Sequence, residues 1–285
     1  MEIKENEINM LSINSLSNKL ELHEGIWRAK SDRAVSYHDE GHANCYQVED
    51  NSFWFVHRNE CIKALIQNYP APDNTVFDIG GGNGFVSKAI EGIGVNTFLV
   101  EPGINGVRNV QARGVKNIIH ASLQDAGFEP GIIPSIGLFD VIEHIENDKA
   151  FIKTIYDAIK PEGRLYLTVP THDWLWSYHD VNAGHWRRYT KKSISELVEQ
   201  AGFKVEYATY FFSALVIPNF ILRAIPTRLG LKKEVDDLKV KKNHHINSEG
   251  AFNKILNTAW KRELNKIKKS KQIFIGNSCI LVAKK

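Results

Sequence analysis

No other stretch of this sequence restricts the fold as much as residues 75–101. A short apolar, β-prone run at residues 76–79 ends in the turn GGGNG, and apolar residues then recur at helical spacing over residues 85–90. A second apolar run, at residues 97–100, ends at Glu101. The pattern predicts a strand, a tight glycine turn, a helix and a second strand, with Asp78 and Glu101 near the ends of the two strands.

The spacing of the glycines indicates which ligand such a turn accepts. The dinucleotide motif G-x-G-x-x-G fails in both registers, because Phe85 or Ser87 stands where its third glycine is needed. This disfavours an NAD-dependent reductase. A carboxylate at the head of the turn suits a ligand that carries an amino group, and Glu101 suits ribose hydroxyls. The pattern that is present is D-x-G-x-G-x-G, formed by Asp78, Gly80, Gly82 and Gly84.

These residues resemble motif I and the following acidic motif of class I S-adenosylmethionine-dependent methyltransferases. The resemblance implies that S-adenosyl-L-methionine is the cofactor and S-adenosyl-L-homocysteine its product. It also implies that the tip of the third strand meets the adenine and that Asp140 follows the fourth strand at the cofactor. The cofactor-binding residues expected on this basis are Asp78, Gly80, Gly82, Gly84, Glu101, Ser122, Leu123 and Asp140.

The expected fold is α/β: a Rossmann-like, seven-stranded, mostly parallel sheet with an antiparallel last strand, helices on both faces and an N-terminal helical cap. Residues 1–35 are interpreted as helix, because apolar residues recur in them with partial helical periodicity. We expect a cap or lid at residues 1–69 and a methyltransferase domain at 70–285 with a basic insertion around 211–270. Further predicted elements are helices at 104–113 and 148–160 and strands at 117–120, 135–139, 164–169 and 273–282.

The segment THDWLWSYHDVNAGHWRRYT, residues 171–190, follows the fifth strand and is expected to overhang the cofactor cleft. It has three interpretations: a metal site, a loop fixed by Arg187 or Arg188 pairing with Asp180, or a surface that faces the substrate. We favour the third and expect no metal, because no histidine pair at i, i+4 supports one. A neutral histidine suits proton removal near pH 7. The catalytic candidates are His144, His179, His185 and Asp180, and the substrate-binding candidates are Trp54, Tyr178, Arg187 and Tyr189.

The net charge of +3 is unevenly distributed. Residues 231–285 carry 14 Lys or Arg against 5 Asp or Glu, a local charge of +9. A solvated helix face accounts for this basic region, and contact with an anionic membrane surface remains open. The apolar run at 211–225 is too short to span a bilayer. The charged N-terminus and three widely spaced cysteines lead us to expect a reduced, cytoplasmic protein.

We therefore expect a methyltransferase that moves a methyl group to an O, N or C atom of a small molecule. One alternative is a cofactor-binding protein without catalysis, and another is a methyltransferase that acts on a lipid or membrane-associated substrate. Nucleic acid is not an expected partner, because DVIE stands at residues 140–143 where an N-P-P-Y-like motif would be. The acceptor, the methylated atom and the oligomeric state stay open.

Overall fold

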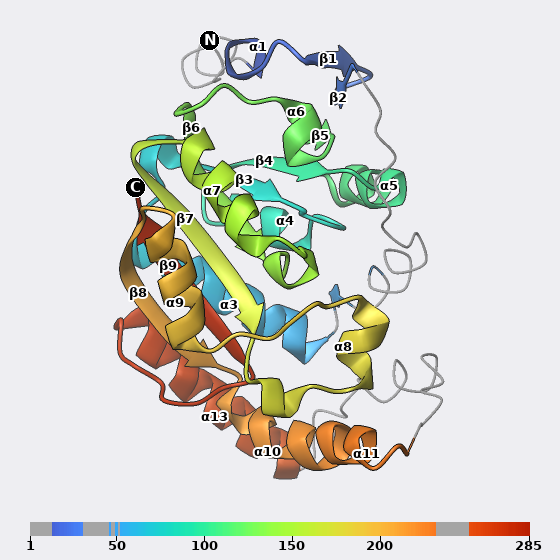
Figure 1. Ribbon diagram of the computed structural model, residues 1–285, viewed down its shortest axis with the longest axis vertical. Coiled ribbons are helices and arrows are strands. Elements are labelled where there is room, and N and C mark those ends of the chain that lie inside the picture. Colours follow the sequence, from blue (N-terminus) through green and yellow to red (C-terminus); the bar gives the residue numbers. More distant parts are fainter. Residues whose placement is uncertain (1–12, 31–45, 47–48, 51, 232–250) are drawn as a thin grey trace.

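The computed structural model describes residues 13–30, 46, 49–50, 52–231 and 251–285 of the 285-residue chain. Within them one sheet has the strand order β1-β2-β5-β4-β3-β6-β7-β9-β8 (Figure 1). The strands are β1 Leu20–His23, β2 Ile26–Ala29, β3 Thr75–Ile79, β4 Asn96–Glu101, β5 Asn117–His120, β6 Ile133–Phe139, β7 Ile159–Pro170, β8 Lys204–Phe211 and β9 Ser278–Lys284.

The centre of the sheet is β3, which pairs in parallel with both β4 and β6. The chain winds outward from β3 through β4 to β5, then returns to β6 and winds the other way to β7, so the winding reverses beside β3 and β6. Both β3 and β6 are buried along their whole length, which fits their mainly apolar sequences. β9 is antiparallel to β7 and β8 and lies between them. The predicted α/β class with an antiparallel last strand is confirmed.

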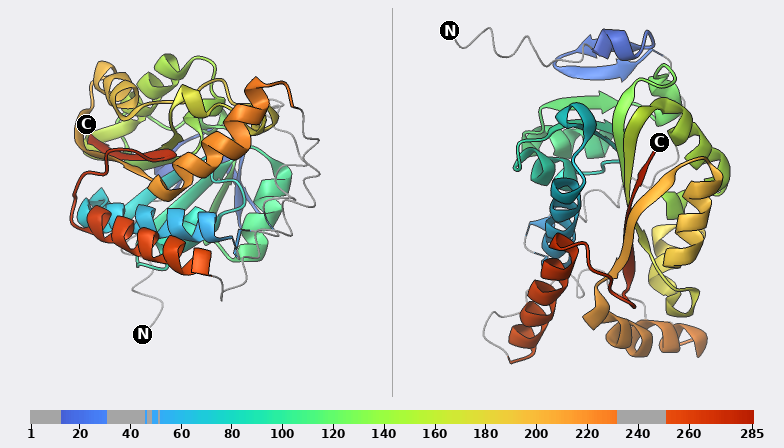
Figure 2. Two further views of the ribbon diagram at one scale, coloured as in Figure 1. Left: turned by 90° about the horizontal axis from the view of Figure 1, so that it is seen from below. Right: turned by 90° about the vertical axis from the view of Figure 1, so that its left-hand side faces the viewer.

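Helices cover both faces of this sheet (Figure 2). One face carries α3 (Phe53–Asn68), α4 (Phe85–Glu91), α5 (Ile104–Arg113) and α13 (Ala251–Lys268), and the other carries α7 (Asp148–Ala158) and α9 (Lys191–Gln200). β7 points towards the short helices α8 (Tyr178–Ala183), α10 (Val216–Asn219) and α11 (Ile225–Arg228), which lie beyond the strand ends (Figure 1). The carboxyl ends of the parallel strands, where ligands bind in open α/β sheets, therefore face these helices.

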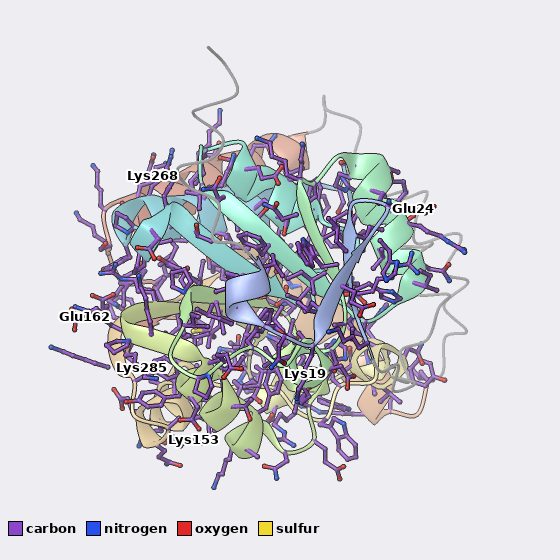
Figure 3. The ribbon with its side chains drawn as sticks, turned by 90° about the horizontal axis from the view of Figure 1, so that it is seen from above. Lys19, Glu24, Lys153, Glu162, Lys268 and Lys285 are labelled. Carbon is purple, nitrogen blue, oxygen red and sulfur yellow. The ribbon has the colours of Figure 1, made fainter. Side chains whose placement is uncertain are left out.

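The prediction of a helix throughout residues 1–35 is wrong for residues 20–29. These residues form a hairpin, in which β1 pairs antiparallel with β2 and β2 pairs in parallel with β5. The turn between β1 and β2 is formed by Glu24 and Gly25, both at positive φ, and Glu24 is labelled in Figure 3. In each strand only the first residue, Leu20 or Ile26, is buried, so the tight Glu24–Gly25 turn and the pairing of β2 with β5 outweigh the weak helical periodicity. The seven expected strands are thus extended by two, and α1 (Ile13–Leu16) is a single short helix. Residues 1–12 and 31–45 of the expected cap lie outside the described residues.

The helix before β3 is part of the main core, because Ile62 and Leu65 of α3 belong to the same hydrophobic cluster as the sheet. α13 packs beside α3, and Glu263 of α13 lies 2.8 Å from Nε2 of His57. The same carboxylate accepts hydrogen bonds from the backbone N–H groups of Phe212 and Ser213, at 2.7 and 2.9 Å. A division of the chain at residue 69 stays a prediction. No helix in the described part of the chain is both long and apolar enough to cross a bilayer.

Candidate active site

The glycine turn after β3 is tied to the end of β4 by hydrogen bonds. The N–H of Gly80 donates to Val100 O at 2.8 Å, and Glu101 accepts from the N–H groups of Gly82 and Gly103 at 2.9 and 2.7 Å. Burial raises the pKa of Glu101 to about 7. Gly82 adopts φ +55° and has no heavy atom within 4 Å of where a Cβ would stand. The turn therefore leaves open space beside a buried acid, as a bound ribose requires.

Asp78 is fully buried beneath this turn. Its carboxylate accepts a hydrogen bond of 2.6 Å from Ser87 Oγ of α4, and burial raises the pKa of Asp78 to about 6. Gly84 has φ +76°, and a Cβ there would lie 3.1 Å from Val115 and 3.3 Å from Val110. The hydrogen bond between Ser87 and Asp78 thus holds α4 against β3. The absence of a side chain at Gly84 lets the start of α4 lie close to Val110 of α5. Direct contact of Asp78 or Gly84 with the cofactor stays a prediction.

The tip of β5 lies next to that of β4, since Ala121 N donates to Glu101 O at 3.2 Å. Ser122 caps the short helix α6 (Leu123–Ala126) and donates through Oγ to Asp125 Oδ2 at 2.7 Å. Leu123 is buried. The structure thus places Ser122 and Leu123, the two residues expected at the adenine, next to the strand end that carries Glu101. Contact of Ser122 and Leu123 with adenine, and of Glu101 with ribose, stays a prediction.

Asp140, at the end of β6, pairs with Arg58 of α3. The guanidinium of Arg58 also lies over the rings of Trp54 and Phe55, 5.0 and 5.4 Å from their centres. Trp54 in turn stacks on Phe212, with 5.3 Å between ring centres. Arg58 was not among the candidates that the sequence indicated, and the available signal was a cation one helical turn after the aromatic residues Trp54 and Phe55. Asp140 at the cofactor and Trp54 at the substrate stay predictions.

A second missed cluster holds the glycine turn from the side of α5. Arg113 donates to Glu49 Oε2 at 2.9 Å and to Asn83 O at 3.0 Å, while Asn83 Nδ2 donates to Glu49 Oε1 at 3.1 Å. Glu49 is buried, and burial raises its pKa despite the nearby cations. A segment that precedes α3 is therefore fixed to the turn itself.

Beyond β7, the buried Asp180 organises residues 171–190. Arg188 donates to its two carboxylate oxygens at 2.8 and 3.0 Å, and the N–H of Ser177 donates at 2.8 Å. His185 Nδ1 lies 3.0 Å from Asp180 Oδ1. Burial acts to raise the pKa of Asp180, but the hydrogen bonds from His185 and Arg188 outweigh burial and hold it below its ordinary value. The interpretation that an arginine pairs with Asp180 to fix the loop is confirmed for Arg188.

His185 meets the residues that follow Asp140. The ring of His144 lies 4.7 Å from that of His185 at an angle of 83°, and the N–H of Trp186 donates to Glu143 O at 2.8 Å. Burial and the adjacent His185 lower the pKa of His144 to about 4, so its imidazole is neutral at pH 7. The structure thus brings together two of the three histidines proposed as catalytic.

The other candidates of this segment have structural partners or are exposed. Arg187 and Tyr189 both contact Asp148 at the start of α7, at 2.6 and 2.9 Å. Tyr178 is exposed on α8, and its N–H donates to Thr227 Oγ1 at 3.0 Å. His179 is partly buried on the same helix. Substrate contact by Arg187, Tyr189 and Tyr178, and catalysis by His179, stay predictions.

This fold, with strand-end acids beside a glycine turn, is typical of S-adenosylmethionine-dependent methyltransferases. Residues 54–208, more than half of the chain, match the model of the methyltransferase domain family. The chain belongs to that family, and S-adenosyl-L-methionine is the cofactor of the class.

One curated relative is a probable S-adenosylmethionine-dependent methyltransferase of Mycolicibacterium smegmatis. It is 23% identical over 162 residues, which are 56% of this chain and 62% of the relative, so the match spans less than two thirds of that protein.

Two solved structures share the fold. A chain of the complex between the Haloferax volcanii Trm112 methyltransferase activator and a methyltransferase matches with a TM-score of 0.54 at 15% identity, covering 86% of this chain and 94% of that one. Phosphoethanolamine N-methyltransferase 2 of Haemonchus contortus, in complex with S-adenosyl-L-methionine, matches with a TM-score of 0.51 at 19% identity, covering 88% of this chain and 60% of that one.

Proposed function

We propose that this protein transfers the methyl group of S-adenosyl-L-methionine to a nucleophilic atom of a small molecule. The observation that carries the proposal is the arrangement at the carboxyl ends of β3, β4 and β6. There, an open space lies beside Gly82 and Glu101, where we propose that the ribose binds, and Asp140 follows β6 at the reversal of the winding. Residues 171–190 lie over the same end of the sheet. We propose that they form the part of the site that binds the methyl acceptor.

Methyl transfer is an in-line displacement, in which the nucleophile takes the methyl group as the sulfonium loses its charge. The cofactor supplies this chemistry, and the protein supplies approach geometry and, for a hydroxyl, thiol or protonated amine, removal of a proton. His185 is the group we propose for orienting or deprotonating the acceptor, because Asp180 fixes its ring through Nδ1. His179, on the same segment, is the second candidate.

The test is methyl transfer itself. Purified protein with radiolabelled S-adenosyl-L-methionine is incubated with fractionated metabolite extracts, and calorimetry measures the affinity for S-adenosyl-L-homocysteine. We expect one binding site and transfer of label to a low-molecular-weight fraction. Binding without transfer would favour a cofactor-binding protein that lacks catalysis, and absence of binding would overturn the proposal. His185→Ala should retain the affinity for S-adenosyl-L-homocysteine while turnover falls.

A lipid or membrane-associated acceptor is a second candidate, favoured by an exposed apolar surface beside α8. Here Arg228 of α11 donates to the carbonyl of Trp174 at 2.7 Å, which fixes this surface to residues 171–190. Five large side chains between residues 217 and 231 are more than half exposed: Ile217, Ile221, Leu222, Leu229 and Leu231.

Sedimentation with phosphatidylglycerol vesicles tests this candidate. The double variant Ile217→Ser, Leu222→Ser should bind vesicles less than the parent protein. Leu22→Ser, which changes a similarly exposed leucine on the β1–β2 hairpin, should leave vesicle binding unchanged. Equal sedimentation of all three proteins would remove the membrane alternative.

A further inference from the structure

Three side chains from two distant segments converge where residues 142–144 meet the loop after α8. Glu143 and His144 belong to the single turn Ile142–His144 that follows β6, and His185 follows α8. One potential ligand atom from each of Glu143, His144 and His185 lies within 4.8 Å of the other two. The hydrogen bond from Trp186 N to Glu143 O holds the two segments together at this point.

Glu143 is the most unusual member of this group. Its side chain is 1% exposed, and among the described residues its Oε2 atom has no hydrogen-bond partner. A buried carboxylate oxygen without a partner is costly, and nearly all buried polar atoms in folded proteins are satisfied. Burial and then the nearby Asp140 raise the pKa of Glu143, and these effects outweigh the opposing effect of Arg58 and Arg188. A cation at this position would satisfy the oxygen and offset the repulsion from Asp140.

His185 is oriented by an oxygen acceptor, as histidines that bind metals are. Asp180 accepts from Nδ1 of His185, which leaves Nε2 as the nitrogen directed to a ligand. The backbone of Ala183 and Gly184 lies near His144 and acts to raise its pKa, against the larger effect of burial. Asp180 is itself fixed by Arg188 and Ser177, so the support of His185 is rigid.

We propose that Glu143, His144 and His185 bind a divalent transition-metal cation. Two imidazoles and one carboxylate suit Zn²⁺, Fe²⁺ and Co²⁺, and the set leaves coordination positions for water or for an oxygen atom of an acceptor. The ligand atoms need to approach one another by less than about 2 Å to reach usual ligand distances of about 2.0–2.2 Å from one ion. The proposed metal site does not include Glu101. The proposal does not depend on whether the methyl acceptor is a small molecule.

The experiment is a metal titration of the full chain, stripped with a chelator and then titrated with Co²⁺ while its visible d–d absorption is recorded. We expect one Co²⁺ per chain, displaced by Zn²⁺. His185→Ala and the near-isosteric Glu143→Gln should each weaken binding at least about 100-fold, since loss of a mere supporting partner costs 10–100-fold. His179→Ala, a histidine of the same segment outside the cluster, should bind Co²⁺ like the parent.

Circular dichroism and affinity for S-adenosyl-L-homocysteine check that each variant is folded, and these readouts are independent of the metal. Absence of Co²⁺ and Zn²⁺ binding by the folded parent protein would overturn the proposal, with Glu143 then simply protonated. Equal Co²⁺ binding by the parent, Glu143→Gln and His185→Ala would overturn it as well. Chelation also distinguishes the two roles proposed for His185. If His185 acts through a bound metal, a chelator should stop methyl transfer. If His185 acts directly as a base, methyl transfer should continue in the presence of the chelator.

Discussion

The guanidinium of Arg188 donates to both carboxylate oxygens of Asp180, through Nε at 2.8 Å and Nη2 at 3.0 Å. Asp180 is 1% exposed, and its oxygens also accept from Ser177 and His185. A carboxylate with this many donors orients its neighbours and has little capacity left for a substrate. We therefore expect Asp180 to position the segment over the strand ends, and its catalytic role stays a prediction.

Replacing Asp180 by Ala should lower the free energy of unfolding by about 3–5 kcal/mol, because it leaves the guanidinium of Arg188 buried and unpaired. Urea denaturation followed by circular dichroism measures the change. Asp173→Ala removes an exposed acid of the same segment and should change stability by about 0.5 kcal/mol or less. Parent-like stability of Asp180→Ala, combined with lost turnover, would instead support the catalytic role expected from the sequence.

Gly82→Ala should weaken cofactor binding by about 10-fold or more at a modest cost in stability. Alanine at φ +55° costs about 1–2 kcal/mol, and its Cβ would enter the open space beside Glu101. Gly94→Ala is a matched control, because Gly94 also has positive φ with nothing within 4 Å but lies in the turn before β4. Calorimetry with S-adenosyl-L-homocysteine and urea denaturation separate the two effects. Equal affinities of the two variants would contradict a cofactor at Gly82.

Unlike Gly82→Ala, which should mainly weaken cofactor binding, Gly81→Ala should mainly lower the stability of the fold. A Cβ at Gly81 would stand 2.6 Å from Leu99 Cγ and 3.1 Å from Asp78 Oδ2, so strand β4 or the turn has to shift. Overpacking of this kind costs about 1–3 kcal/mol. The melting temperature should fall further than in Gly94→Ala, and a melting temperature equal to that of the parent protein would show that the turn adapts freely.

Cofactor affinity should rise about 10-fold between pH 6 and pH 8. With the pKa of Glu101 at about 7, only about a tenth of its side chains are ionised at pH 6, and the ionised form is the better acceptor for ribose hydroxyls. The effect on folding has the opposite sign. Because the folded-state pKa is raised, the group stabilises the fold at acidic pH, and this contribution is lost as the pH rises through about 7. Calorimetry across the range, repeated with Glu101→Gln, tests this: the variant should show a flatter pH profile, and an unchanged slope would assign the titration to another group.

Glu263→Ala should release α13 from the domain. The carboxylate contacts His57 at 2.8 Å and accepts from two backbone N–H groups at the end of β8, all in a buried position. Breaking such a buried pair costs about 3–5 kcal/mol. Hydrogen exchange should accelerate in α13 and around residue 212, whereas Glu199→Ala, an exposed acid of α9, should leave exchange unchanged. Unaltered protection of α13 in Glu263→Ala would show that apolar packing alone holds it.

The local pattern of the sequence was sufficient for the central elements. The strand, glycine turn, helix and strand over residues 75–101 follow from apolar periodicity and glycine spacing, and the helix at 104–113 and strand at 117–120 are confirmed at those residues. Such signals are local, because the side chains that create them lie within a few residues of one another. The same reasoning failed at residues 20–29, where a weak helical period was preferred to a hairpin that is stabilised by pairing with β5.

Which polar groups meet was decided only by the tertiary structure. Arg58 of α3 and Asp140, directly after β6, are 82 residues apart in the sequence and meet only in the folded chain. Glu143 and His144 reach His185 because the chain crosses from β6 through β7 and then turns back over the strand ends. The sequence by itself determined the parallel sheet and the position of the glycine turn in it. Partners brought together by packing across the sheet carry no short-range pattern, so only the folded chain assigns them.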